Sequence, residues 1–325
     1  MCGSRRLRRT TWKAFRLSGL SKAQQPRTVL AIVGPTAAGK SDLAMRVATE
    51  IGAEIVSIDS GAVYRGMDLG TAKPSREDQA RIVHHMIDCV DPSQNISVAQ
   101  FQSRARLALE QIAERGKTPL LAGGSGLYFR AVVDPLEFPP TDPATRRRLA
   151  AAAGRMGIAG LHHLLVSVDP AAAARIPLAN ERRIIRALEV VAITGKRFSD
   201  FGSNWDEFES MYPLRVAGLS PPRPELDRRI ESRVDRLFEG GLVGEVESLI
   251  RKGYKASVTA VQALGYAQVL EYLEGRISLE KAIADTKSRT RRFARRQLTW
   301  FRADPRVEWF AEPEGAFRAL IGALN

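Results

Sequence analysis

The sequence contains little cysteine and little histidine. Its 325 residues include two cysteines, Cys2 and Cys89, four histidines and no Cys-x-x-Cys pair. A disulfide framework or a structural zinc site needs several such side chains at short spacings, so both are excluded. We expect both thiols to be free, and we expect the histidines to be packed or solvent-bonded rather than catalytic.

Long apolar runs are also missing. No window approaches the roughly 18 uninterrupted apolar residues of a membrane span, and the N-terminus lacks the apolar centre of a secretory signal. We therefore expect a cytoplasmic protein with no membrane segment. The length of 325 residues is enough for one large domain or two ordinary ones, and the composition is that of a globular protein.

Acidic residues are absent from residues 1–28, which hold eight basic side chains, whereas the whole chain has a net charge of +13. With no convincing apolar period, this segment is typical of a disordered extension or of an over-long start. Because it is rich in arginine and free of acids, an RNA-binding arm or an organellar presequence stays open.

One motif stands out in what the sequence does contain. Residues 34–41 match the pattern G-x-x-x-x-G-K-[ST], after an apolar run at 29–33 that predicts a buried strand and before helical apolar spacing. In such a loop the backbone N–H groups and the helix N-terminus point at one place, Lys40 adds a positive charge, and the Ser41 hydroxyl can hold Mg²⁺. The predicted di- or triphosphate site consists of Gly34, Pro35, Thr36, Ala37, Ala38, Gly39, Lys40 and Ser41.

Strands and helices alternate after this loop. A second strand at 54–58 ends at Asp59, and a third at 118–122 ends in a Gly-Gly-Ser segment that closes at Ser125. The pattern predicts an α/β fold, with a P-loop NTPase-like parallel sheet flanked by helices. Ligands of such sheets lie outside the carboxyl ends of the strands, so the phosphate loop, Asp59 and Ser125 should share one crevice.

The middle of the chain differs from the rest in composition and in predicted secondary structure. Residues 139–213 are rich in alanine and arginine, have helical spacing and show no evident strand. This pattern predicts an all-helical insertion domain at 139–213. The insertion divides the catalytic core into two parts, 29–138 and 214–311. The second part is expected to be mostly helical and to end in a strand at 307–310. Residues 312–325 are expected to be a C-terminal tail.

A basic helix is expected near the carboxyl end. Seven basic residues recur at helical spacing from Lys287 to Arg302, and no acid occurs before Asp304. Apolar residues, including Phe301, occupy another face, so the helix should dock by one side and present arginines on the other. RNA phosphates would suit that face, although a solvated helix surface would show the same pattern. The helix at 180–188 has a second basic face.

The chemistry of the crevice is open at this stage. A phosphate-loop enzyme that splits nucleotides usually has a strand ending in Asp or Asp-Glu, which completes the magnesium shell and positions water. Here the third strand ends in Gly-Gly-Ser, and Asp59 is the available carboxylate. From spacing alone, Asp59 could be a metal ligand, a general base or the cap of the next helix.

The ordered set of motifs resembles the tRNA dimethylallyltransferases. The resemblance covers about residues 29–311, and the Lys73-Pro74 and Arg296-Gln297 segments are specific to that family. The matching segments, in the family's order, are 34–41, 57–60, 64–74, 85–88, 91–92, 123–128, 183–189, 265–266 and 294–302.

The resemblance implies a reaction. The family transfers a dimethylallyl group from dimethylallyl diphosphate to N6 of adenosine 37 in tRNAs that read codons beginning with U. The phosphate loop would then bind a diphosphate leaving group. The match makes Asp59 the base, and it makes Lys40 and Ser41, with Mg²⁺, the groups that stabilise the diphosphate. Ser125 stands where most relatives carry Thr and should contact the adenosine.

The resemblance also implies the binding residues and partners. Arg229 looks like an arginine that grips the diphosphate from the side opposite the loop, although a surface helix charge would give the same pattern. Ala267 stands where many members have Arg, which puts one contact in doubt. We expect a monomer whose partners are the tRNA anticodon stem-loop and dimethylallyl diphosphate. The residues expected to contact tRNA are Asp59, Ser60, Gly61, Ala62, Ser125, Arg146, Arg182, Arg183, Ile184, Ile185, Arg186, Gln262, Ala263, Leu264, Gly265, Tyr266, Ala267, Arg292 and Arg295.

Three rival functions share some of these features. A free-nucleotide isopentenyltransferase would use the loop and Asp59 but would not need the helical insertion or the arginine helix. A small-molecule kinase of the phosphate-loop class would turn over a nucleoside triphosphate. A noncatalytic RNA-binding module would leave the ordered crevice residues without a role.

Overall fold

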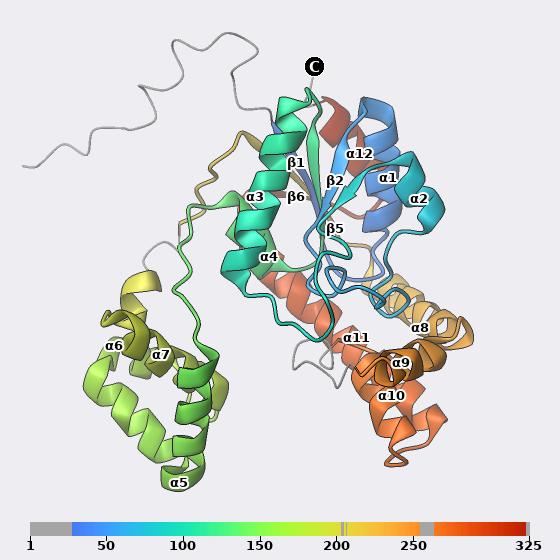
Figure 1. The fold of residues 1–325 in the computed structure, drawn as a ribbon. Helices are drawn as coiled ribbons and strands as arrows, with labels where there is room; N and C mark the ends of the chain where they lie inside the picture. Colours follow the sequence, from blue (N-terminus) through green and yellow to red (C-terminus); the bar gives the residue numbers. More distant parts are fainter. Residues whose placement is uncertain (1–27, 203–204, 206, 254–262, 323–325) are drawn as a thin grey trace, which may run out of the picture.

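The computed structural model describes residues 28–202, 205, 207–253 and 263–322. A six-stranded sheet lies at its centre, with parallel pairing throughout and the order β3-β2-β4-β1-β5-β6 (Figure 1). The parallel α/β fold expected from the sequence is therefore confirmed. The strands are β1 (Val29–Val33), β2 (Glu54–Ser57), β3 (His84–His85), β4 (Pro119–Gly123), β5 (Leu214–Leu219) and β6 (Val307–Phe310).

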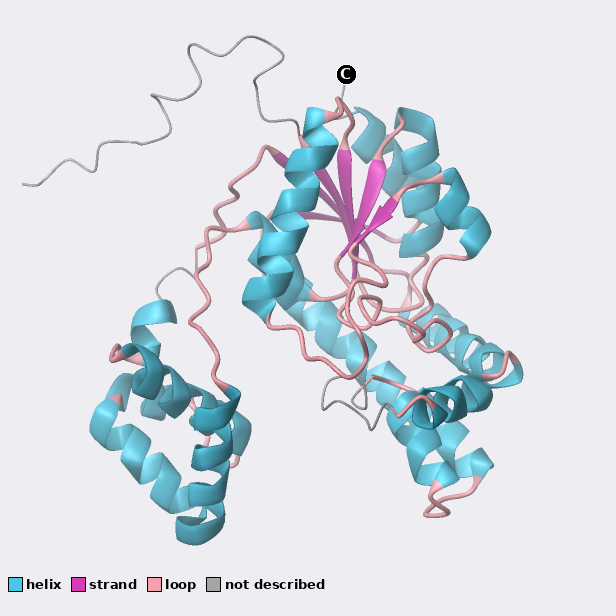
Figure 2. Cartoon of the chain, in the orientation of Figure 1, coloured by secondary structure: helices cyan, strands magenta, loops and turns pink. Residues whose placement is uncertain are grey.

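Helices cover both faces of the sheet (Figure 2). One face packs against α1 and α12, and the other against α3 and α4. The helices are α1 (Lys40–Ile51), α2 (Arg76–Arg81), α3 (Val98–Glu114), α4 (Gly126–Val133), α5 (Pro143–Val168), α6 (Pro170–Arg175), α7 (Glu181–Thr194), α8 (Arg223–Glu239), α9 (Leu242–Arg251), α10 (Tyr266–Leu273), α11 (Leu279–Arg302) and α12 (Pro313–Gly322), with a 3₁₀ helix at Phe198–Gly202.

Strand β1 shows why the first apolar run is continuous rather than alternating. All five of its residues are buried. Leu30 and Ile32 pack in the α1 and α12 layer, whereas Ala31 and Val33 pack in the α3 and α4 layer. A strand covered on both faces needs apolar side chains on both, which is the usual pattern in parallel sheets. Its carboxyl end is thereby fixed in the middle of the sheet, where the phosphate loop begins.

Residues 313–322 form a helix and not the expected C-terminal tail, so the sequence prediction was wrong for this stretch. Helix α12 packs on the sheet beside α1, with Ala316 and Leu320 buried. Arg46 of α1 donates a hydrogen bond to Glu314 at 2.9 Å. The apolar residues of this helix recur at helical spacing, which is the sequence signal for a helix that packs by one face.

This packing predicts a stability effect. Leu320→Ala should lower the free energy of unfolding by about 2–5 kcal/mol, because it leaves a cavity in the layer that covers β5. Denaturant unfolding followed by circular dichroism measures it. Leu107→Ala on α3 is the control, because Leu107 is 53% exposed and its loss should change stability by less than about 0.5 kcal/mol. Equal effects for the two variants would show that α12 is not part of the core.

The helical segment between β4 and β5 has a core of its own. Helices α5, α6 and α7 pack around Leu161, Leu165, Ile184 and further apolar residues, and they stand apart from the sheet in Figure 1. Helix α5 is kinked at Gly157, whose φ is 73°. In the part of the chain that the structure describes, α5 alone has the length and apolarity of a membrane span, and the kink divides it into pieces shorter than the roughly 20 residues that a span requires.

Candidate functional site

The phosphate loop connects β1 to α1. Gly34 has a φ of 138°, and a Cβ there would lie 2.5 Å from the Leu219 carbonyl oxygen, so only glycine fits. Ala37 and Gly39 also have positive φ, at 64° and 89°. These turns bend the backbone around a small volume at the N-terminus of α1, where amide groups and the helix dipole favour an anion.

Lys40 is the first residue of α1, and its ammonium group lies at the loop. Nζ donates a hydrogen bond to the Pro35 carbonyl at 2.6 Å. Burial lowers the pKa of Lys40 to about 8, although the nearby Asp59 carboxylate opposes this shift. Arg233 lies close enough to lower the pKa of Lys40 further. A cation that is partly desolvated in this way interacts strongly with a bound phosphate.

Asp59 lies just beyond β2, on the edge where the phosphate loop begins. The register pairs β2 with β4 and β4 with β1, so the three carboxyl ends are neighbours. Asp59 Oδ1 accepts the Gly61 N–H at 2.8 Å, which fixes the carboxylate. The strand order brings Asp59 and Lys40 to neighbouring strand ends, as the sequence predicted, and the Asp59 carboxylate acts to raise the pKa of Lys40.

Ser125 lies at the adjacent strand end. It is the residue before α4, in the N-cap position, but its side chain makes no capping hydrogen bond. The side chain is half-buried, between the phosphate loop on one side and the end of β2 on the other. Its hydroxyl is therefore not committed to the helix, in contrast to that of Ser97, which caps α3.

Arg233 is a site residue that the sequence analysis missed. It lies one helical turn after Arg229 on α8, and it interacts electrostatically with Asp59 and Lys40. Burial lowers the pKa of its guanidinium, and Asp59 opposes that shift. Arg229 itself forms an ion pair with Glu225, and its Nη1 would lie 4.0 Å from a Cβ at Gly39. Both arginines therefore lie against the phosphate loop.

Gln297 is a second missed residue. It lies on the buried face of α11, where its Oε1 accepts the Thr36 N–H at 2.9 Å and its Nε2 donates to the Gly124 carbonyl at 2.8 Å. The sequence analysis noted Arg296-Gln297 only as part of a motif. The sequence signal for a special role of Gln297 is its amide on the inward face of an amphipathic helix, because that position is usually apolar.

Three residues expected to contact tRNA have buried side chains. The side chains of Ile184 and Ile185 are buried in the core of the helical segment. Tyr266 is buried as well, and its hydroxyl donates to Glu245 at 2.5 Å. These three side chains support the surrounding backbone rather than present themselves to a ligand. Gln262 lies outside the described residues.

Two arginines expected at tRNA already have protein partners. Arg146 and Arg186 each donate to Glu189 Oε2 at 2.8 Å, and Arg186 also donates to the carbonyls of Pro139 and Pro140. Arg186 therefore clamps the chain that enters the helical segment onto α7. Arg146 is exposed at this junction, whereas Arg182 and Arg183 lie on the exposed start of α7.

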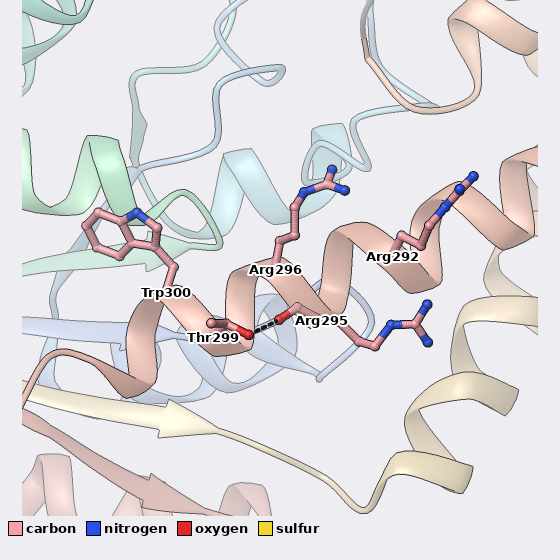
Figure 3. Close-up of a pocket in the computed structure, with 5 residues that line it drawn as sticks. All are labelled: Arg292, Arg295, Arg296, Thr299 and Trp300. Carbon is pink, nitrogen blue, oxygen red and sulfur yellow. Dashed lines mark hydrogen bonds between the residues drawn. The ribbon is translucent and has the colours of Figure 1, made fainter. Parts of the chain in front are cut away.

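The outer face of α11 carries a hollow of about 540 Å³, lined by Arg292, Arg295, Arg296, Thr299 and Trp300 (Figure 3). In this view the Arg292 and Arg296 side chains point to one side of the helix and the Arg295 side chain to the other, and Trp300 lies toward the end of the helix. Trp300 also packs on Gly126, next to Ser125, because a Cβ at Gly126 would lie 2.0 Å from the indole ring.

Two other basic residues of α11 are neutralised by acids from α8. Lys287 pairs with Asp235 at 2.6 Å, and Arg291 pairs with Glu231 at 2.7 Å. Residues 287–302 of α11 contain no acid, as the sequence argument said, but acids of α8 lie against them in space. The candidate phosphate-binding face is therefore narrower than predicted and centres on Arg292, Arg295 and Arg296.

The oxygen atoms near the phosphate loop suit a Mg²⁺ ion that is bound partly by the protein and partly by the phosphates of a substrate. Among the described residues, no three or more His, Cys, Asp and Glu side chains form a group that could hold a metal. Mg²⁺ is usually held by one or two protein oxygens, with waters and substrate phosphates completing its shell. Ser41, exposed at the second position of α1, offers one such oxygen beside the loop.

Comparison with known proteins shows which family this chain belongs to. A model of the IPP transferase family matches residues 62–304. A tRNA dimethylallyltransferase of Carboxydothermus hydrogenoformans is 48% identical over 87% of this chain and 91% of its own length. One from Moorella thermoacetica is 48% identical over 94% of this chain and 96% of its own.

Solved structures agree with this match. The tRNA isopentenylpyrophosphate transferase of Bacillus halodurans is 40% identical, with a TM-score of 0.67, over 92% of this chain and 97% of its own length. A eukaryotic dimethylallyltransferase acting on tRNA aligns with a TM-score of 0.74 at 24% identity and so shows a shared fold. These proteins therefore share the overall fold of this chain.

Proposed function

This chain belongs to the IPP transferase family, and from that premise we propose that it transfers a dimethylallyl group from dimethylallyl diphosphate to N6 of adenosine 37 in tRNAs that read UNN codons. One observation carries the proposal: a phosphate loop, a carboxylate and an uncommitted hydroxyl meet at three neighbouring strand ends. A diphosphate and an amine can therefore lie side by side.

The proposed chemistry is an alkyl transfer. The N6 lone pair attacks the first carbon of the dimethylallyl group, the carbon–oxygen bond breaks, and diphosphate leaves with the bonding electrons. The loop amides and Lys40 stabilise the charge that develops on the leaving oxygen. Asp59 takes the proton that the amine loses, and its fixed orientation holds the accepting oxygen in place.

Other groups complete the diphosphate site. Arg233 lies against Lys40 and Asp59, and Arg229 lies against Gly39, so both can add positive charge on the side of α8. Mg²⁺, when bound, would neutralise charge on the diphosphate, with Ser41 as the residue that holds it. Strand β4, the third strand expected from the sequence, ends in Gly123 and not in the carboxylate that nucleotide-splitting enzymes place there, which disfavours a kinase.

The proposed tRNA surface joins two basic regions. The α11 arginines share a hollow with Trp300, which packs on Gly126 next to Ser125, and the exposed arginines at the start of α7 lie on the helical segment. A substrate that reaches both must be large, as the anticodon stem-loop of a tRNA is, whereas a free nucleotide would leave both unused. We infer that the protein acts as a monomer in the cytoplasm, where this RNA is found.

Nucleoside mass spectrometry tests the proposed reaction. The protein is incubated with dimethylallyl diphosphate, Mg²⁺ and unmodified tRNA, and the digested tRNA should contain N6-isopentenyladenosine and no other new nucleoside. Free adenosine monophosphate replaces tRNA in a parallel reaction and should give no product. Product from the free nucleotide alone, or ADP release that accompanies product formation from ATP, would overturn the assignment.

The hydroxyl of Ser125 should contribute to the rate. We expect Ser125→Ala to slow single-turnover transfer by about 2- to 10-fold, which corresponds to the loss of one neutral hydrogen bond. Ser125→Thr keeps the hydroxyl and should stay within about twofold of the wild type. If serine and alanine give the same rate, the hydroxyl has no role in the reaction.

The α11 arginines should bind RNA phosphates. We expect Arg292→Ala with Arg295→Ala to weaken tRNA binding for all tRNA species and to flatten the salt dependence by about one to two units of log–log slope. The control is Lys287→Ala with Arg291→Ala on the same helix, because both residues are already paired with α8 acids. An unchanged slope in the first variant would show that the hollow is only a solvated face.

A further inference from the structure

Gln297 joins the two halves of the candidate site. It is 7% exposed, and its side chain bonds two backbone groups that are distant in sequence. One is the Thr36 N–H of the phosphate loop, and the other is the Gly124 carbonyl, directly before Ser125. A single side-chain amide therefore links the loop that would hold diphosphate to the loop that would contact the adenosine.

The fit around this amide is close. A Cβ at Gly124 would lie 2.1 Å from Gln297 Nε2 and 3.1 Å from the Gly34 carbonyl oxygen. The two loops and the amide are thus packed against one another, with no space even for a methyl group at Gly124. A change in the position of Gln297 has to be taken up by one of the two loops.

The hydrogen-bond character of Gln297 is also specific. Its carbonyl oxygen meets a donor and its NH₂ group meets an acceptor, so one neutral amide satisfies both backbone groups. Methionine has a similar length but satisfies neither group. Ionised glutamate satisfies the Thr36 N–H but sets an oxygen against the Gly124 carbonyl. A protonated glutamate would restore both bonds.

We propose that Gln297 is a positioning residue that sets the separation between the phosphate loop and Ser125, so that the diphosphate and the attacking amine are aligned. The inference rests on the proposed transfer reaction. A misplacement of about 1 Å between reacting groups can cost up to about 100-fold in rate. The outer face of the same helical turn carries Arg295 and Arg296, so Gln297 also ties the tRNA-facing helix to the diphosphate site.

Gln297→Met is the first test. We expect kcat at saturating substrates to fall about 10- to 100-fold, and we expect the Kd of inorganic pyrophosphate with Mg²⁺ to rise about tenfold, the loss expected for one buried hydrogen bond. The Kd for tRNA should stay within about twofold. The matched control is Gln102→Met, because the Gln102 amide also bonds two carbonyls, those of Ala131 and Leu136, at 2.8 Å and away from the site.

Gln297→Glu tests the same bond through pH. Burial favours the neutral form of a carboxyl, and only that form can donate to Gly124. The kcat of this variant, divided by that of the wild type at each pH, should rise about tenfold as the pH falls from 8.5 to 6, with thermal melts confirming a folded protein at each pH. A side chain that merely fills space would give a flat ratio.

The outcomes separate this inference from the proposed function. If wild-type protein transfers no dimethylallyl group, the proposed function fails, and pyrophosphate binding still tests the link between Gln297 and the loop. Wild-type kcat and pyrophosphate affinity in folded Gln297→Met would overturn the inference, as would an equal loss in Gln102→Met. If Gln297→Met does not fold, the pH ratio of Gln297→Glu decides, and a flat ratio overturns it.

Discussion

Replacing Asp59 with alanine should lower the rate of transfer by about 10²- to 10⁴-fold and leave tRNA binding close to that of the wild type. A general base contributes this much because the amine must lose a proton as the new bond forms. The Asp59 carboxylate lies at the strand end beside the phosphate loop, and Lys40 and Arg233 lie within electrostatic range of it. Single-turnover kinetics with saturating tRNA measure the effect.

Asp59→Asn separates the base from the structural role of the same side chain. Asparagine keeps an oxygen that can accept the Gly61 N–H, so the local turn should survive. We expect a loss of rate similar to that of the alanine variant. Asp78→Asn, in the first turn of α2 and away from the strand ends, is the matched control and should stay within about twofold of the wild type. Wild-type turnover by folded Asp59→Asn would remove Asp59 from the base role.

Much of the fold could be predicted because its signals are local. The continuous apolar run of β1, the phosphate-loop pattern and the strand ends at Asp59 and Ser125 each depend on a few neighbouring residues. The parallel sheet then brings the three ends together without further information. The two-residue strand β3 was missed because so short a segment carries no period.

The parts of the site that were missed depend on long-range packing. Helix α8 carries several arginines, and only its placement against the loop shows that Arg233 lies near Asp59 and Lys40. Gln297 bonds residues 261 and 173 positions away, which no local pattern reports. The pairing of Lys287 and Arg291 with α8 acids is likewise a contact between helices rather than a property of α11.

Lys40→Ala should damage the diphosphate side of the reaction. We expect kcat to fall by about 10²- to 10³-fold, the usual cost of removing one preorganised donor from a developing anion. The Kd of pyrophosphate with Mg²⁺ should also rise, whereas the Kd for tRNA should be unchanged. Lys117→Ala is the control, because Lys117 pairs with Glu54 at 3.1 Å at the opposite end of the sheet.

The pH dependence of pyrophosphate binding is a second test of the role of Lys40. The pKa of Lys40 is lowered to about 8 by burial, so its charge is present below that pH and is lost as the pH rises through it. Wild-type affinity for pyrophosphate, divided by that of Lys40→Ala to cancel the titration of pyrophosphate itself, should therefore fall about tenfold between pH 7 and pH 9. A ratio that stays constant would show that the Lys40 ammonium does not act on the bound phosphates, and the diphosphate would then be held by the loop amides, Mg²⁺, Arg229 and Arg233.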